Sequence, residues 1–269
     1  MAASERVVGA TITGTVDTTS AMVFSMAVAA GTPVSDERIT ATVNGTSFAL
    51  REIGAGHGTR LHVAEQVPTG ELEVVYTATV TGPGDIPDDG ELDRIVASRP
   101  SRYCPSDAMV ALATSEFGDQ HGPDLLATVA ARVHDALVYD GSETRPTDTA
   151  LDTWLRRTGV CRDYAHVTAA FLRALGVPAR LVSVYAPGLD PMDFHAVVEA
   201  WTGGGWHVAD ATRLAPRDGL VRIATGRDAA DTAFLSVLDG TFTMGDLLVS
   251  AAGGDPRATD DHDHPVQLR

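Results

Sequence analysis

The spacing of apolar residues changes near residue 82, and no other feature limits the fold as strongly. From Val7 to about Val80, short runs rich in Val, Thr, Ile and Ala alternate with turn signals, as in "ATITGTV" and "ELEVVYTATV". Asn44-Gly45 fits a two-residue hairpin turn. Farther along the chain, apolar residues recur at helical spacing instead. The two patterns predict an α+β protein, in which a small antiparallel β-sandwich or barrel precedes a helix-containing core.

The segment between the two patterns is typical of a linker. "TGPGDIPDDGELD", residues 81–93, is dense in Pro, Gly and Asp and has no apolar period. We therefore predict a β-rich domain over residues 1–82, a linker over 83–100 and a core over 101–255. The last residues, 256–269, carry enough Asp and His to bind a divalent ion, but a flexible, solvated acidic tail is the simpler interpretation.

Composition restricts the chemistry and the partners. The 269 residues are 44% hydrophobic and 21% charged, which is typical of a globular protein with its own core. Two cysteines do not make a disulfide framework and no cleavable leader is visible, so we expect a cytoplasmic protein. The net charge of −16 disfavours nucleic acid and anionic membranes. No apolar run approaches the roughly 18 to 20 residues that a membrane span needs.

The core begins with predicted helices. Ser106 can cap one that runs to Phe117, Pro123 can open a second, and Thr147 can cap a third that ends at Arg157. These helices lead to the segment "TGVCRDYAHVTAAFLRALGVPARLV", residues 158–182, which contains one of the two cysteines.

Cys161 lies at the start of the helix in this segment. The apolar face that follows it ends at Leu175, and Gly176 stops the helix. A helix N-terminus has unpaired amide donors and a partial positive charge, which favour a thiolate and lower the pKa of a cysteine. The same donors can stabilise an oxyanion that forms beside the sulfur. The position therefore suits a nucleophile, although a lone cysteine is more often a small buried residue.

A partner for the thiolate is predicted on a downstream hairpin. "FHAVVEAW" and "WHVADAT" flank three glycines, and a Gly203-Gly204 turn would place Trp201 opposite Trp206. In that register His195 and Asp210 point to the same side, with backbones roughly 7 to 8 Å apart, so that their side chains can hydrogen-bond. A slip of one residue would move Asp210 to the other face of the sheet.

Three runs resemble the bacterial transglutaminase-like superfamily of papain-type cysteine enzymes: "RRTGVCRDYAHVTAAFLRALGVPARLVSVY", "DFHAVVEAW" and "WHVADATRLAP". The resemblance covers about residues 100–235, and the β-rich part also looks like the domain that precedes the core in this family. It implies helices packed on an antiparallel sheet. It further implies Cys161 as the nucleophile, His195 as the general base and acid, and Asp210 as the group that orients the imidazole.

The sequence departs from the commonest family pattern at two positions. Tyr164 replaces a phenylalanine and could add a hydroxyl near the cleft, and Ala211 replaces a proline and could loosen the strand that carries Asp210. Further, weaker candidates for binding substrate are Tyr103, Tyr164, Trp154, Arg227 and Asp228.

Three other polar or sulfur-bearing residues have structural interpretations. Cys104 and His166 are interpreted as packing residues. Glu199 either shares the face of His195 or is a solvated or ion-paired strand residue.

Together these patterns predict acyl transfer through a Cys161 thioester, without cofactor or metal. No C-x-x-C pair supports a zinc site. Hydrolysis of a peptide, protein or small amide is the preferred interpretation, because water is always available. Transfer to an amine, as by a transglutaminase or acyltransferase, shares the first half-reaction and stays open. A noncatalytic binding protein on the same fold is the third alternative, and the oligomeric state is not indicated.

Overall fold

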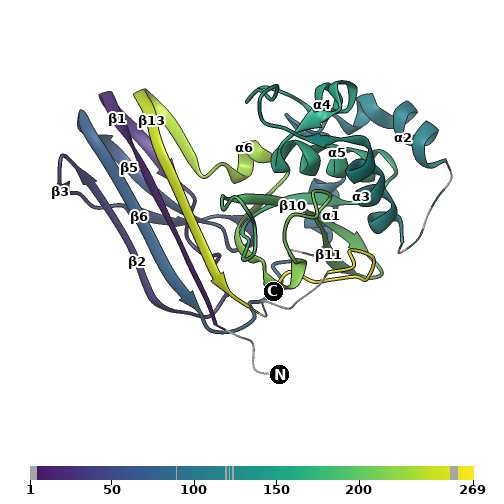
Figure 1. The fold of residues 1–269 in the computed structure, drawn as a ribbon, viewed down its shortest axis with the longest axis horizontal. Coiled ribbons are helices and arrows are strands. Elements are labelled where there is room, and N and C mark those ends of the chain that lie inside the picture. Colours follow the sequence, from purple (N-terminus) through teal and green to yellow (C-terminus); the bar gives the residue numbers. More distant parts are fainter. Residues whose placement is uncertain (1–4, 89, 119, 121, 123, 255–259) are drawn as a thin grey trace.

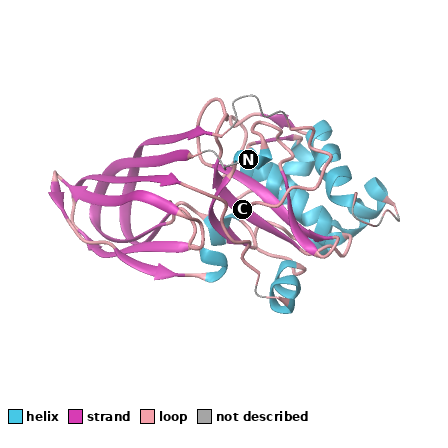
Figure 2. Ribbon diagram, turned by 90° about the horizontal axis from the view of Figure 1, so that it is seen from below, coloured by secondary structure: helices cyan, strands magenta, loops and turns pink. Residues whose placement is uncertain are grey.

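The structure, a computed structural model, describes residues 5–88, 90–118, 120, 122, 124–254 and 260–269. Its strands form two antiparallel sheets and one short parallel pair. Figure 1 shows the first sheet as a lobe beside the core. Figure 2 shows the second sheet between this lobe and most of the helices. The predicted α+β architecture is confirmed.

The first sheet is long and curled. Its strands are β1 (Arg6–Phe24), β2 (Val34–Val43), β3 (Thr46–Ser47), β4 (Arg51–Gly54), β5 (Arg60–Val67), β6 (Gly70–Val80) and β13 (Leu235–Gly253). They follow the order β3-β2-β6-β1-β5-β4, and β13 pairs with β1. β1 pairs with β6 over its first part and with β5 over its last, and register shifts between Val16 and Met22 bend it. The sequence predicts a sandwich or a barrel for this part of the chain. The structure has one curled sheet that forms a half-barrel.

Alternating burial explains why these segments are strands. Leu72 and Val74 of β6 are buried, while Glu73 between them is exposed. Asn44 and Gly45 form the predicted turn between β2 and β3, with φ angles of 49° and 76°. Such positive φ angles suit a two-residue hairpin turn and favour these two residue types.

The core is a sheet covered by helices. The second sheet has the order β11-β10-β9-β12 and contains β9 (Ala179–Tyr185), β10 (His195–Thr202), β11 (Gly205–Ala209) and β12 (Val221–Gly226). The α-helices are α1 (Glu91–Ala97), α2 (Val110–Phe117), α3 (Leu125–Ala136), α4 (Ala150–Arg156), α5 (Cys161–Ala174) and α6 (Ala229–Thr232). Short 3₁₀ turns are η1 (Gly56–Gly58), η2 (Ser106–Met109) and η3 (Arg217–Gly219), and the parallel pair is β7 (Val138–Tyr139) with β8 (Thr158–Gly159). Helix α5 is central, since it packs on β9 and β10 and is covered by α3 and α4.

The predicted helices are present, but two predicted caps are wrong. Ser106 lies inside η2, whose N-cap is Pro105, and no described side chain caps η2 or α2. Residues 106–117 form η2 and α2, and α5 has the predicted start. The predicted cap of α4 was wrong: Thr149, not Thr147, forms a capping box with Asp152. Pro123 lies outside the described residues. Among the described residues, no helix has both the length and the apolar character to span a membrane.

Three segments differ from the predicted division of the chain. Residues 91–97 of the predicted linker form α1, and residues 235–253 of the predicted core form β13, which returns to the first sheet. In the predicted flexible tail, Asp260 pairs with Arg217 and Leu268 is buried. Each segment is held by partners that are distant in sequence, which local composition does not reveal. The domain boundaries themselves stay a prediction.

A buried ion cluster holds the second sheet together. Glu199 on β10 is fully buried and accepts hydrogen bonds from Arg180 on β9 and Arg222 on β12. A buried carboxylate needs such partners, because an unpaired charge in the interior is costly. Of the predicted roles for Glu199, the structure therefore supports the ion-paired strand residue, and its carboxylate is not solvated.

Candidate active site

The first turn of α5 fixes the position of Cys161. Asp163 is buried, and its Oδ2 accepts hydrogen bonds from the Val160 amide at 3.0 Å and from the Thr144 hydroxyl at 2.6 Å. A Cβ atom on Gly159 would lie 2.6 Å from Cβ of Asp163, so this position of the "TGVCRD" run needs glycine. These contacts leave Cys161 half-buried at the helix N-terminus, with its sulfur open to a cavity.

The predicted hairpin brings His195 and Asp210 together. Strands β10 and β11 pair with Trp201 opposite Trp206, which confirms the predicted register. Nε2 of His195 lies 2.8 Å from Oδ2 of Asp210, and both side chains are buried. The other carboxylate oxygen accepts hydrogen bonds from the Thr212 amide at 2.9 Å and the Thr212 hydroxyl at 2.7 Å. Asp210 is thus fixed on both sides.

The second nitrogen of His195 is available for the thiol. Nε2 is occupied by Asp210, whereas Nδ1 is buried and has no hydrogen-bond partner among the described residues. Burial disfavours the charged imidazolium, but Asp210 and the side chain of Cys161 outweigh burial and raise the pKa of His195 to about 10. An imidazole held in this way can carry a proton next to the sulfur at neutral pH.

Tyr139 is a site residue that the sequence analysis missed. It lies on β7, where the Asp140 amide donates to the Gly159 carbonyl at 3.0 Å and so ties this strand to the segment just before Cys161. The Tyr139 hydroxyl interacts with both the backbone amide and the side chain of Cys161. Partial burial and the nearby Cys161 raise the pKa of Tyr139, so its hydroxyl keeps its proton. The surrounding run "LVYDG" is too short to show a helical or alternating pattern, so the sequence contains no clear indication of this strand.

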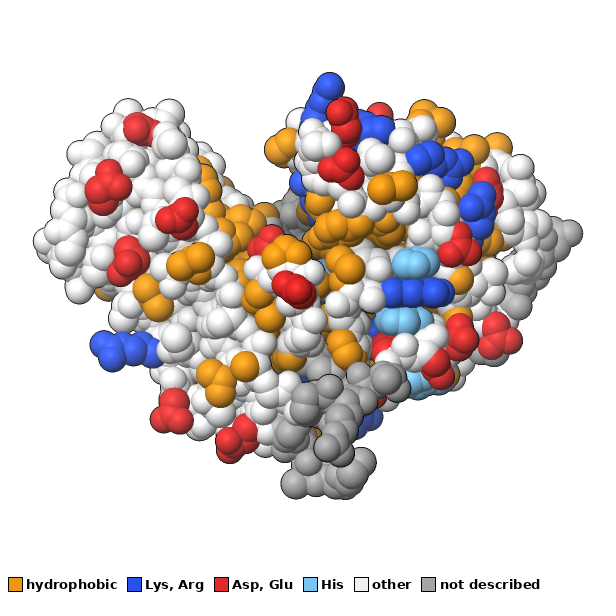
Figure 3. All heavy atoms as spheres, in the orientation of Figure 1, with side chains coloured by type: hydrophobic (Ala, Val, Ile, Leu, Met, Phe, Trp, Pro, Cys, Tyr) orange, Lys and Arg blue, Asp and Glu red, His pale blue; other side chains and the backbone are white. Residues whose placement is uncertain are grey.

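A cavity of about 350 Å³ opens beside Cys161 and His195. Part of its wall comes from β13 of the first sheet, through Leu235 and Leu247, so both lobes of the protein form it. Figure 3 shows a hollow between the two lobes with hydrophobic side chains on its walls. Cys161 therefore lines a cavity with room for part of a ligand.

Of the weaker candidates, only Tyr103 lines this cavity. Trp154 was predicted to bind substrate, but it is 1% exposed and packs its ring edge-to-face against Phe171 at 4.7 Å. Tyr164 is also buried, with its ring 6.0 Å from that of Tyr139. Both aromatic rings belong to the hydrophobic core, where their large apolar area stabilises the fold.

Asp228 contacts Tyr103, which lines the cavity, but does not line the cavity itself. It is buried, caps α6 through the Ala230 amide and accepts a hydrogen bond from the Tyr103 amide at 2.8 Å. Its carboxylate thus positions a wall residue and does not reach the cavity.

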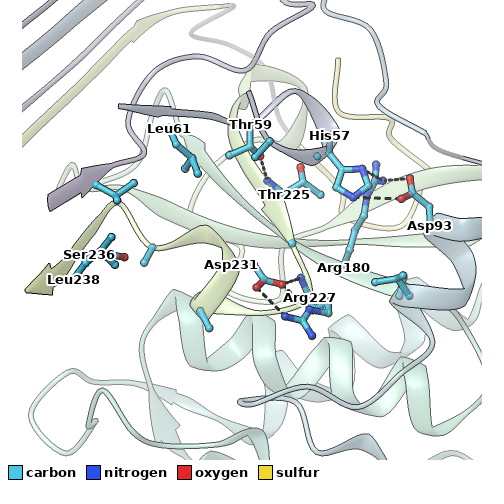
Figure 4. Close-up of a pocket in the computed structure, with 18 residues that line it drawn as sticks. His57, Thr59, Leu61, Asp93, Arg180, Thr225, Arg227, Asp231, Ser236 and Leu238 are labelled. Carbon is cyan, nitrogen blue, oxygen red and sulfur yellow. Dashed lines mark hydrogen bonds and ion pairs between the residues drawn. The ribbon is translucent and has the colours of Figure 1, made fainter. Parts of the chain in front are cut away.

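Arg227 belongs to a second cavity of about 450 Å³, on the other side of α6. Figure 4 shows Arg227 paired with Asp231 there, and His57, Asp93 and Arg180 linked to one another at another wall. These charged groups neutralise each other, which leaves no uncompensated charge for a ligand. The predicted contact of Arg227 with the substrate cleft is therefore not present.

Cys104 and His166 pack as the sequence analysis indicates. Cys104 is fully buried, and burial raises the pKa of its thiol to about 12. His166 is also fully buried, stacks on Tyr103 at 5.2 Å and accepts a hydrogen bond from the Ala229 amide. Burial lowers the pKa of His166 to about 4, so this imidazole is neutral.

One cluster has the residue types of a metal site. Asp260, Asp261 and His264 bring ligand atoms within 4.8 Å of one another. Asp261 and His264 are exposed. Both carboxylates already form ion pairs within the protein, Asp260 with Arg217 and Asp261 with His264. The cluster is not part of the Cys161 cavity.

Comparisons with known proteins identify the family of the chain. The family model of the transglutaminase-like superfamily matches residues 111–211. The solved structure of a "Putative Cysteine Protease" from Cytophaga hutchinsonii is 32% identical, with a TM-score of 0.86, over 97% of this chain and 94% of that one. A more distant solved structure, the periplasmic domain of TgpA from Pseudomonas aeruginosa, is 20% identical over 79% of this chain and 88% of that one, with a TM-score of 0.42.

An uncharacterised protein of Mycobacterium leprae is 31% identical over 144 residues, which are 50% of this chain and 52% of that protein. The match thus spans about half the length of this curated relative. The fold and the cysteine-bearing helix define a transglutaminase-like class of thiol-dependent enzymes. The chain belongs to the transglutaminase-like superfamily.

The raised pKa of His195 gives a first prediction. In the native protein the His195 ring should titrate near 10, above its ordinary value of 6.5, so its ion pair stabilises the fold below about pH 6.5 and is lost as pH rises toward 10. In Asp210→Asn, only Cys161 is left to oppose burial, and the pKa of His195 should fall well below its native value. Imidazole ¹⁵N chemical shifts measured against pH test this. The exposed Asp190→Asn variant is the control and should leave the titration unchanged, whereas an unaltered titration in Asp210→Asn would contradict the account.

Proposed function

We propose that this protein transfers acyl groups from amides through a thioester on Cys161, with water as the acceptor. One observation carries the proposal: a buried His195–Asp210 pair, 2.8 Å apart, leaves the free nitrogen of His195 for a cysteine at a helix N-terminus. These three groups are the nucleophile, the proton carrier and the positioning group that thiol acyl transfer needs.

In the first half-reaction, the Cys161 thiolate attacks the amide carbonyl carbon and forms a C–S bond. The tetrahedral intermediate collapses as the C–N bond breaks, and Nδ1 of His195 gives its proton to the leaving nitrogen. The products are an acyl-enzyme thioester and a free amine. Asp210 holds the imidazole in place during this step through Nε2.

In the second half-reaction, water attacks the thioester carbonyl carbon while Nδ1 of His195 takes a proton from it. The C–S bond breaks, the carboxylic acid leaves and the thiolate–imidazolium pair is restored. Cys161 is half-buried and Tyr139 beside it is 47% exposed, so bulk water reaches this point. This access favours hydrolysis over amine transfer, which needs exclusion of water.

Two donors can stabilise the oxyanion of the tetrahedral intermediate. The Cys161 amide belongs to the first turn of α5, and the Tyr139 hydroxyl contacts both this amide and the Cys161 side chain. A carbonyl oxygen entering between them would accept from the amide and from the protonated phenol.

The proposal predicts an acetyl-enzyme with p-nitrophenyl acetate. A burst of p-nitrophenol should accompany an acetyl adduct by intact mass, and peptide mapping should place it on Cys161. All 20 basic residues are arginines, so no lysine side chain competes for acetyl groups, and Cys104 is buried. Cys161→Ala should show neither burst nor adduct. A burst that persists in Cys161→Ala would contradict the proposal.

Removing the Tyr139 hydroxyl tests the oxyanion role. Tyr139→Phe should slow acetylation of Cys161 by p-nitrophenyl acetate about 100-fold or more, as loss of one oxyanion donor does elsewhere. Reaction of the same thiol with iodoacetamide, which forms no oxyanion, should change less than about threefold. Equal slowing of both reactions would instead indicate that Tyr139 only positions the cysteine.

A further inference from the structure

The charges that line the Cys161 cavity do not cancel. Arg162 faces the cavity, but its guanidinium donates to Oδ1 of Asp163 at 2.8 Å and to the Thr144 hydroxyl at 2.9 Å. Its positive charge is therefore compensated within the protein. His195 is likewise compensated by Asp210. Besides the Cys161 thiolate of the proposed mechanism, the cavity is left with the carboxylate of Asp193.

Asp193 is an exposed residue at the mouth of this cavity. Its Oδ1 accepts a hydrogen bond from the adjacent Phe194 amide at 2.7 Å. Among the described residues, no Arg or His side chain forms an ion pair with it. The Asp193 charge also influences both His195 and Tyr139 electrostatically, which places it close to the reacting atoms. A carboxylate in this position attracts a cation that enters the cavity.

The position of Asp193 along the chain indicates which side of the substrate it meets. It lies two residues before His195, the group that in the proposed mechanism gives a proton to the leaving nitrogen. Groups next to this imidazole therefore face the amine side of the scissile bond. By microscopic reversibility the same place would receive an incoming amine in the reverse direction.

Apolar residues lie beside this carboxylate. Phe194 stacks on Phe234 at 5.4 Å, and both line the cavity with Leu235 and Leu247. A long basic side chain has an aliphatic stem and a charged head, which match an apolar wall that ends at a carboxylate.

We propose that Asp193 is a specificity-determining residue that selects substrates with a basic side chain on the amine side of the scissile bond. This proposal rests on the proposed acyl transfer at Cys161.

Charged thiol reagents test the electrostatic part without turnover. Cationic 2-(trimethylammonium)ethyl methanethiosulfonate and anionic 2-sulfonatoethyl methanethiosulfonate label accessible thiols, and intact mass follows the rate of each. Because Cys104 is fully buried, labelling should report Cys161, and Cys161→Ala should abolish it. The ratio of cationic to anionic rates should fall about tenfold in Asp193→Asn. Asp190→Asn, an exposed carboxylate in the same loop outside the cavity lining, should keep the native ratio.

A peptide library of natural sequences tests the specificity. The native protein should enrich Lys or Arg on the amine side of cleaved bonds, and Asp193→Asn should lose this enrichment. Cleavage without basic enrichment, or an unchanged reagent ratio in Asp193→Asn, would overturn the proposal while leaving hydrolysis intact. A ratio that falls as expected in a protein that forms no acyl-enzyme would contradict the proposed hydrolysis and support the charge preference of the site.

Discussion

The structure around the site depends on the hydrogen bond between Nε2 of His195 and Asp210. Both residues are buried, so the ion pair is shielded from water and each partner stabilises the charge of the other. This bond directs the other imidazole nitrogen toward Cys161. It also links β10 to the end of β11, so the same contact that prepares the chemistry fixes two strands of the core.

Much of this site could be predicted from the sequence because its determinants are local. The Gly203-Gly204 turn sets the β10–β11 register, and the register alone brings His195 and Asp210 to one side. The start of α5 is equally local, since its apolar face begins directly after Cys161. Short-range turn and helix signals thus suffice for the reacting groups.

The parts that the sequence did not reveal are held by distant partners. Strand β13 follows the core in sequence but pairs with β1, and nothing in its own pattern shows which strand it joins. Tyr139 reaches Cys161 because β7 pairs with β8, a contact between segments of two residues each. Conversely, Trp154 was predicted to bind substrate, but its packing against Phe171 places it in the hydrophobic core.

The return of β13 gives the first sheet a part in the site. Leu235 and Leu247 from this strand line the cavity beside Cys161, so the lobe without the cysteine builds part of the apolar wall. If the proposed reaction takes place here, changes in the first sheet should alter substrate preference without changing Cys161.

The central claim is that the imidazolium of His195 holds a thiolate at residue 161. The rate of iodoacetamide alkylation as a function of pH tests it most directly in the native protein and in His195→Ala. Because the thiolate is the reacting species, the native protein should react at least about tenfold faster than His195→Ala at neutral pH. Two superimposable rate profiles would contradict the account.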